Sequence, residues 1–300
     1  MKIPVTVIGG YLGAGKTTLI NYMLRSANGL RLAILVNEFG DLAIDQDLIE
    51  AQDDGVMAIS GGCVCCAYGN DMIGALEDMR DATPAFDHIL IEASGVALPA
   101  SIMTTVGMVY GLRPDATIVL ADVEQIRKNA RHKFLHDTIL AQLEQADLLL
   151  LTKTDLVDAS VVEDVKDWLS TVAPIARSLP IANGEIALEA LIGAIPFAQR
   201  RPMENVTHKS VFDSIVITPD HNIDPQALGE AFANDPTITR AKGFVQTATG
   251  TALIHVVGSR YAFDLLDDHH SLGVVCIGIK GEFDPSNAEK HMRHAERTDA

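Results

Sequence analysis

The chain has 300 residues, of which 48% are hydrophobic and 21% charged, a composition typical of a globular protein with a substantial core. This length fits one large domain followed by a small one. The net charge is −17, from 23 basic and 40 acidic residues. Such a surface repels phosphate backbones, so nucleic acids and anionic membranes are poor candidates as partners.

The N-terminal residues lead directly into an apolar, strand-like run, without a separate signal-peptide core or a small-residue cleavage site. No apolar stretch reaches the length that a membrane-spanning helix needs. We therefore expect a cytoplasmic protein. In that compartment, three cysteines within four residues indicate metal or redox chemistry rather than a structural disulfide.

Short apolar runs alternate with segments of helical spacing over the first half of the chain. Strands are predicted at residues 5–8, 32–36, 56–60, 89–91, 116–121 and 148–151. Helices are predicted at 16–26 and 70–80, with a further one beginning near Pro99. This alternation predicts the α/β class, with a mostly parallel sheet.

The pattern changes after residue 195, where prolines and paired arginines predict a linker over 196–209. We assign 1–195 to the first domain. Beyond the linker, a strand at 211–218, a helix at 225–234, a hairpin around Thr249-Gly250 and a strand at 273–279 predict a small α+β domain over 210–283. Residues 284–300 read as a polar, frayed tail.

Residues 10–17 match the phosphate-loop pattern G-x-x-x-x-G-K-[ST] in full, between a predicted strand and a predicted helix. Glycines let backbone N–H groups curl around phosphates, and the helix N-terminus adds positive potential. Lys16 would reach the β- and γ-phosphates as a catalytic cation, and Thr17 would ligate Mg²⁺. The expected nucleotide contacts are Gly10, Leu12, Gly13, Ala14, Gly15, Lys16, Thr17 and Thr18.

Glu92 ends the strand at 89–91 and is followed shortly by Gly95. Ligands of open α/β sheets sit at the carboxyl ends of strands. Glu92 could hold the Mg²⁺ shell or orient the attacking water, and it could also be an ordinary polar strand end. Beside the phosphate loop we favour a catalytic role.

Residues 152–155, Thr-Lys-Thr-Asp, follow another strand and resemble the guanine-reading pattern N-K-x-D. Asp155 could accept two hydrogen bonds from guanine that adenine cannot offer, while the stem of Lys153 packs on the ring. Thr152 replaces the asparagine, which removes a contact near guanine N7. The alternative for Asp155 is a helix N-cap.

The three clustered cysteines, Cys63, Cys65 and Cys66, follow the strand at 56–60. Two of them could bind one soft or borderline cation such as Zn²⁺, Co²⁺ or Cu(I), with further ligands from elsewhere. Glu38, Asp41, Asp45 or a histidine would complete the set. A redox pair or inert thiols are the alternatives. Cys276 reads as a core residue.

These motifs stand in one order: GGYLGAGKTT at 9–18, GCVCC at 62–66 and EASG at 92–95. Together they resemble the CobW-type family of metal-handling GTPases, relatives of the urease and hydrogenase nickel-insertion GTPases. NEFG at 37–40 and the block at 152–155 resemble further family motifs, and threonine occurs in place of the asparagine in other members. RAKGF at 240–244 resembles the family's C-terminal domain. The resemblance spans residues 3–280.

The resemblance implies a P-loop GTPase that uses GTP and Mg²⁺ and binds zinc or cobalt at the cysteine motif. Cys63, Cys65, Cys66 and Glu38 are the implied ligands. Hydrolysis to GDP would be coupled to metal delivery to a client metalloprotein or a cobalamin-pathway enzyme. The resemblance also allows a homo-oligomer. Two departures stand out: Asn183 replaces a histidine that many members have, and the tail has only scattered histidine pairs, such as His291 and His294. The competing interpretations are a metal-storage or sensing module with vestigial hydrolysis, and a P-loop small-molecule kinase.

Overall fold

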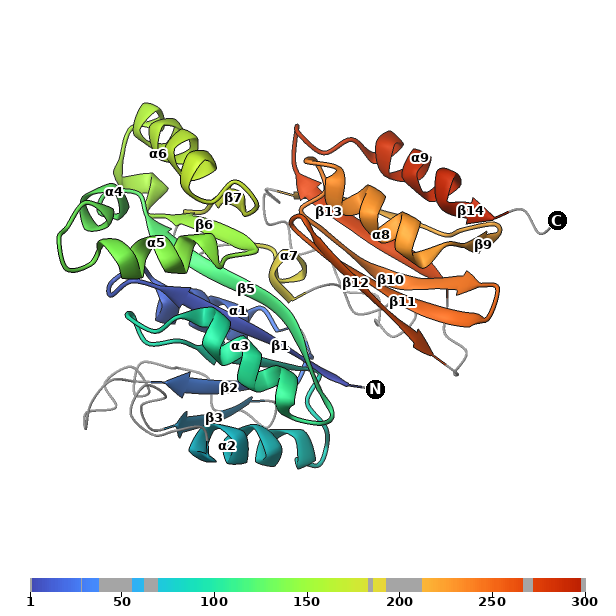
Figure 1. The fold of residues 1–300 in the computed structure, drawn as a ribbon, viewed down its shortest axis with the longest axis horizontal. Helices are drawn as coiled ribbons and strands as arrows, with labels where there is room; N and C mark the ends of the chain where they lie inside the picture. The colour runs from blue at the N-terminus through green and yellow to red at the C-terminus, as the bar shows by residue number, and fades with distance from the viewer. Residues whose placement is uncertain are drawn as a thin grey trace. The chain divides into compact units, whose positions relative to one another are not determined.

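The protein is described from a computed structural model, which covers residues 2–27, 29–37, 56–61, 70–182, 186–192, 212–266 and 272–297. The chain divides into two compact units, Met1–Glu185 and Ile186–Ala300 (Figure 1). Each unit has its own sheet and its own covering helices, so each is described by itself.

The first unit contains a seven-stranded sheet in the order β3-β2-β4-β1-β5-β6-β7, and all of its strand pairs are parallel. This confirms the predicted fold class. The strands are β1 (Ile3–Gly10), β2 (Leu32–Asn37), β3 (Val56–Gly61), β4 (His88–Glu92), β5 (Leu112–Asp122), β6 (Leu148–Thr152) and β7 (Arg177–Pro180).

The inner strands of this sheet are buried on both faces, as parallel strands covered by helices must be. All five residues of β4 and all five of β6 are buried. The helices are α1 (Lys16–Arg25), α2 (Asn70–Asp81), α3 (Pro99–Met108), α4 (Ile126–Ala130), α5 (His136–Glu144) and α6 (Ala159–Val172).

Two apolar clusters pack this sheet against its helices, and each takes every second residue of a strand, because successive side chains of a strand point to opposite faces. Val5, Val7 and Ile91 form one core cluster with residues of α2 and α3. Leu149 and Leu151 of β6 form another with residues of α4, α5 and α6. The helical spacing read in the sequence for residues 70–80 thus produces a buried face on α2.

The second unit is built around a five-stranded antiparallel sheet in the order β12-β11-β10-β13-β8. Its elements are α7 (Leu188–Ile192), β8 (Phe212–Ile217), β9 (Asn222–Ile223), α8 (Pro225–Asn234), β10 (Arg240–Thr247), β11 (Gly250–Val257), β12 (Arg260–Leu266), β13 (Gly273–Ile279), α9 (Pro285–Ala295) and β14 (Glu296–Arg297). One core cluster joins residues of α8 and α9 to this sheet, and it includes Cys276, which is fully buried as predicted.

Helix α7 belongs to the second unit, whereas the sequence analysis placed residues up to 195 in the first domain. Arg240 of β10 explains part of this assignment, because its Nη1 donates a hydrogen bond to the Leu191 carbonyl oxygen at 2.6 Å. Arg240 is only 1% exposed, so this bond gives one donor of a buried guanidinium its acceptor. The predicted linker, 196–209, lies outside the described residues.

Gly243 allows β10 and β13 to approach closely. A Cβ atom added there would lie 2.0 Å from the Gly273 carbonyl oxygen and 2.6 Å from Val274 Cα, both backbone atoms that cannot move aside. Gly74 of α2 differs, because a Cβ added at that position meets nothing within 4 Å. The glycine of the RAKGF segment is therefore required by strand packing.

The frayed tail predicted from residue 284 is wrong, because α9 occupies most of it. Ala288 and Met292 of this helix are buried in the core of the second unit. Asp284 caps the helix by accepting a hydrogen bond from the Ser286 backbone nitrogen at 2.9 Å. The sequence looked polar because only one face of α9 is apolar, and that narrow face is the buried one.

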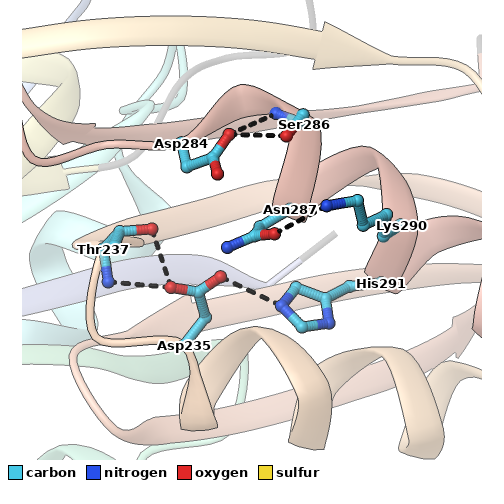
Figure 2. A network of polar contacts seen from close by, with 7 residues as sticks. All are labelled: Asp235, Thr237, Asp284, Ser286, Asn287, Lys290 and His291. Atoms are coloured by element: carbon cyan, nitrogen blue, oxygen red, sulfur yellow. Dashed lines mark hydrogen bonds and ion pairs between the residues drawn. The ribbon is translucent and has the colours of Figure 1, made fainter.

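His291 of α9 is held by a carboxylate rather than standing in solvent (Figure 2). Its Nε2 lies 2.9 Å from Asp235 Oδ2, and Asp235 Oδ1 accepts from the Thr237 backbone nitrogen and hydroxyl at 2.8 and 2.7 Å. Burial opposes ionisation of Asp235, yet these hydrogen bonds outweigh it, so its pKa lies below the usual value. Burial also raises the pKa of the Cys276 thiol, which keeps it protonated and unreactive.

Among the described residues, none of the helices combines the length and the apolar character that crossing a bilayer would require.

Candidate functional site

The candidate site lies where the carboxyl ends of β4, β1, β5 and β6 meet at one edge of the large sheet. Ile8 of β1 pairs with Glu92 of β4, and Asp122 of β5 pairs with Thr152 of β6. The chain runs from β1 to one side of the sheet through β2 and later to the other side through β5. Open α/β sheets bind ligands in the crevice that such a reversal creates.

The glycines of the phosphate loop adopt backbone conformations that let the loop curl, as the sequence motif predicts. Gly10, Gly13 and Gly15 have φ angles of 128°, 76° and 97°, a region that favours glycine. Gly10 also lies against β5, since a Cβ added there would be 2.7 Å from the Leu120 carbonyl oxygen. The loop's shape is therefore determined by both local conformation and strand packing.

Helix α1 begins directly after the loop and leaves its N-terminus suited to an anion. Its N-cap is Gly15, no side chain caps it, and its first turn contains no acidic residue. Backbone N–H groups at such a terminus attract negative charge. Ala14 is buried at 3% exposure, whereas Leu12 is 66% exposed and Thr18 is exposed on the helix.

Lys16 is the first residue of α1, and its ammonium folds back over the loop. Its Nζ donates to the Gly10 carbonyl oxygen at 3.0 Å, and the residue is only 8% exposed. A cation held over a ring of backbone N–H groups is the arrangement that stabilises β- and γ-phosphate oxygens. The position fits the role predicted for Lys16.

Thr17 and Glu92 bring two oxygen ligands together at the start of α1. Thr17 Oγ1 donates to Glu92 Oε1 at 3.4 Å, although the residues are 75 positions apart. Glu92 is 3% exposed and ends β4 next to the phosphate loop. Hydroxyl and carboxylate oxygens are the ligands that Mg²⁺ prefers, so these residues fit a Mg²⁺ ion beside bound phosphates.

The turn after Glu92 is held against the rest of the site from two sides. Gly95 packs on the phosphate loop, since a Cβ added to it would be 2.8 Å from the Leu12 backbone nitrogen. Gln142 of α5 donates from Nε2 to the carbonyl oxygens of Gly95 and Ala97 at 3.1 and 2.8 Å. Gln142 is 1% exposed, so it fixes the backbone next to the predicted catalytic carboxylate.

Residues 152–155 join the phosphate loop directly. Thr152 Oγ1 donates to the Ala14 carbonyl oxygen at 2.9 Å, which ties the end of β6 to the loop. Lys153 has a φ of 60° and its Nζ lies 2.6 Å from Asp122 Oδ2. The threonine that replaces the expected asparagine thus bridges the two predicted nucleotide-binding segments.

Asp155 lies in a short 3-10 helix, Thr154–Leu156, that follows β6. The residue is exposed, and its carboxylate makes no hydrogen bond or ion pair within the part of the chain that the structure describes. It is not an N-cap of α6, because Asp158 occupies that position. The carboxylate is therefore available to a ligand that sits over Lys153.

The metal-binding residues predicted from the sequence, Glu38, Cys63, Cys65 and Cys66, lie outside the described residues. Within the ranges that are described, no group of three or more His, Cys, Asp or Glu side chains is arranged to hold a metal ion.

Asp122 and Gln142 are the site residues that the sequence analysis missed. Asp122 ends a buried strand at the same sheet edge as Glu92, and that position was a usable signal. Gln142 gave no signal, because a glutamine within a helix is ordinary and its partners lie 45 or more positions away.

A parallel sheet whose first strand ends in a glycine loop, with Lys16 and Thr17 opening the next helix, defines a P-loop nucleotide-binding protein. The chain belongs to the CobW/HypB/UreG family of P-loop GTPases. The nucleotide-binding domain of that family matches residues 4–180, and the cobalamin synthesis protein cobW C-terminal domain matches residues 212–296.

Relatives of known name cover most of the chain. The zinc chaperone CobW of Sinorhizobium sp is 32% identical, over 86% of this chain and 86% of that protein. The zinc chaperone CobW of Pseudomonas aeruginosa is 30% identical, over 98% of this chain and 92% of that protein. The crystal structure of Zn(II)-bound YjiA GTPase from E. coli shares the fold, with a TM-score of 0.50, 22% identity, and coverage of 99% of this chain and 100% of that one.

Proposed function

We propose that this P-loop GTPase is a metallochaperone, which binds a transition metal at its cysteine motif and couples GTP hydrolysis to delivery of that metal. Zinc is favoured over cobalt, because the relatives that cover most of the chain are named zinc chaperones. The recipient would be a client metalloprotein or a cobalamin-pathway enzyme.

The observation that supports coupling between GTP hydrolysis and metal binding is a row of paired residues on three neighbouring strands of the sheet. Glu92 of β4 pairs with Val36 of β2, which pairs with Ser60 of β3. Neighbouring strands lie about 5 Å apart, so Ser60 is only about 10 Å from Glu92. Cys63 follows Ser60 by three residues in the chain, so the cysteine motif starts from the edge that carries the predicted catalytic carboxylate.

The register between β2 and β3 also supports the proposed metal ligands. Asn37 of β2 pairs with Gly61 of β3. Glu38 is one residue and Cys63 two residues beyond that pair, and consecutive Cα atoms are about 3.8 Å apart. Thiolates with one carboxylate oxygen make a donor set that suits Zn²⁺. We propose Cys65 and Cys66 as ligands, with Cys63 and Glu38 completing the site.

The nucleotide chemistry follows from the geometry of the phosphate loop. Lys16 would place its positive charge on the transferred phosphoryl group, where negative charge develops in the transition state. Glu92, with Thr17, would hold Mg²⁺ or orient the attacking water, and Mg²⁺ when bound supplies charge neutralisation at the phosphates. Asp155 would select guanine by accepting hydrogen bonds from its N1–H and N2 amine.

The proposal is tested by measuring Zn²⁺ affinity with a competing chelator in the apo, GDP-bound and GTP-analogue-bound protein. The analogue should tighten binding about tenfold over GDP, which corresponds to about 1.4 kcal/mol of coupling. By linkage, Zn²⁺ should tighten binding of the analogue by the same factor. Equal metal affinities in all three states would refute coupled delivery.

Substitutions separate the parts of the site. Cys65→Ser with Cys66→Ser should abolish tight Zn²⁺ binding, whereas the matched control Cys276→Ala removes a buried thiol of the second unit and should not affect it. Lys16→Ala should abolish phosphate release, and Glu92→Gln should reduce it strongly while sparing nucleotide affinity. Release of phosphate without an added acceptor would exclude the small-molecule kinase.

A further inference from the structure

A pocket of about 590 Å³ lies beside the nucleotide site, formed by the residues that follow β5 together with α4 and α6. Its basic lining residues are Arg127, Lys128, Arg131 and His132. The P-loop, Glu92 and residues 152–155 do not line it. The proposed GTPase and metal chemistry therefore leaves this pocket unexplained.

The charge of this pocket is opposite to that of the chain. Residues 127–133 contain four of the 23 lysines and arginines, plus His132, within seven positions. The chain as a whole carries a net charge of −17, so removing these four positive charges leaves −21 on the rest. A local concentration of positive charge on such a background attracts anionic groups specifically to this surface.

Three of these four cations have no polar partner in the part of the chain that the structure describes. Among the described residues, Arg127, Lys128 and Arg131 make no side-chain hydrogen bond or ion pair. Glu124 and Asp164 also line the pocket, but neither forms an ion pair within that part of the chain. Three cations and two carboxylates leave an excess of positive charge, which a ligand can neutralise.

The walls of the pocket are apolar between these charges. Val123 and Val165 are buried at 3% and 1% exposure, and Val161 is 37% exposed. Beyond the basic residues, Phe134 is 79% exposed, and Lys133 Nζ lies 5.6 Å from its ring centre. The surface thus combines cations with apolar contacts, which a peptide with both acidic and apolar side chains would complement.

Other anionic ligands fit this surface less well. A small phosphate ligand needs converging backbone N–H groups of the kind found at residues 10–17, and α4 has only five residues. A nucleic acid would extend past the pocket onto a surface that carries the remaining negative charge. A short acidic peptide would be confined to the pocket, where three lysine and arginine side chains outnumber the two carboxylates.

We propose that this pocket binds an acidic segment of a partner protein, in which carboxylate and apolar side chains alternate. The pocket is linked to the nucleotide site through Val123, a lining residue whose backbone nitrogen donates to the Thr152 carbonyl oxygen at 3.2 Å. Glu124 donates from its backbone nitrogen to Asp122 Oδ1 at 2.9 Å. The partner would therefore be held next to the loop that contains Lys153.

The test is fluorescence anisotropy of the full chain with a short labelled peptide that alternates Glu-Glu with Leu. Lys128→Gln with Arg131→Gln should weaken binding at least about tenfold, and binding to the wild type should weaken as salt rises. The matched control, Lys2→Gln with Lys280→Gln, removes two exposed positive charges elsewhere and should change affinity less than about twofold. Replacing Leu by Ser in the peptide should weaken binding about fivefold.

Three results would overturn the proposal: equal losses in the two double variants, equal binding of a Lys-Lys/Leu peptide, or tighter binding of a single-stranded oligonucleotide than of the acidic peptide. Both double variants should release phosphate from GTP at the wild-type rate, because none of the four residues lies in the nucleotide site. Failure of the peptide assay is therefore distinguishable from failure of the proposed function.

Discussion

The contact between Asp122 and Lys153 gives the most direct test of how the base-reading loop is organised. Asp122 Oδ2 lies 2.6 Å from Lys153 Nζ, and the two side chains are 10% and 35% exposed. Asp122→Asn keeps the shape of the side chain and a hydrogen-bond acceptor but removes its charge. Lys153 would then be held less firmly in the position where its stem packs on guanine.

The magnitude follows from the difference between charged and neutral hydrogen bonds. A hydrogen bond to a charged group contributes about 1.5–3 kcal/mol and a neutral one about 0.5–1.5 kcal/mol. Because Lys153 is partly exposed to solvent, the lower end applies, about 1 kcal/mol. We expect GTP and GDP affinity to fall about fivefold, since 1.4 kcal/mol corresponds to tenfold.

The assay is titration of the protein with a fluorescent guanine nucleotide, with ATP as a competitor. Asp78→Asn is the control, because Asp78 is an exposed carboxylate on α2, away from the site. An unchanged GDP affinity in the Asp122 variant would refute the role of this ion pair in base binding. An equal loss for GTP and ATP would show that the variant disturbs the phosphate loop instead.

Four further predictions concern the packing of the fold and of the site. Gly243→Ala should destabilise the second unit by about 3 kcal/mol or more in urea denaturation, because the added Cβ meets fixed backbone atoms. Gly74→Ala, in open space on α2, should instead stabilise by about 0.5–1 kcal/mol. Asp235→Asn should lower the free energy of unfolding by about 1–2 kcal/mol at neutral pH. The fold lowers the pKa of the Asp235 carboxyl, so the ionised carboxylate stabilises the folded state at pH values above the ordinary aspartate pKa. The difference in unfolding free energy between wild type and variant should therefore shrink as the pH falls below about 4. A difference that stays constant with pH would contradict this role of Asp235. Gln142→Leu should slow phosphate release while largely sparing GDP affinity, since it leaves two carbonyl oxygens beside the site without their donor. The control Glu144→Leu, at an exposed position of the same helix, should have little effect.

The phosphate loop could be predicted from the sequence because its function depends on contiguous residues. Gly10, Gly13 and Gly15 adopt the positive φ angles that their residue type allows, and Lys16 and Thr17 follow at the start of α1. The alternation of apolar runs and helical spacing likewise determined the parallel sheet, because the period of buried residues is a local property. The family resemblance rested on the same contiguous motifs, and it is confirmed by the matches to both family domains.

The tail shows where local pattern was insufficient. Residues 285–295 contain few apolar side chains, and an isolated polar segment of that length is marginal as a helix. α9 is stable because Met292 and Ala288 pack into a core formed by other elements, and because His291 meets an aspartate 56 positions earlier in the chain. Neither partner can be read from the segment itself.

The contacts of the site were decided by tertiary structure alone. Which carboxylate meets Thr17, which acid holds Lys153, and which side chain supports Gly95 depend on strand order and helix placement, across separations of 75, 31 and 47 positions. The sequence supplied the chemistry of each segment, because backbone conformation and residue type act locally. The neighbours of each segment follow only from how all the apolar faces of the chain are buried together.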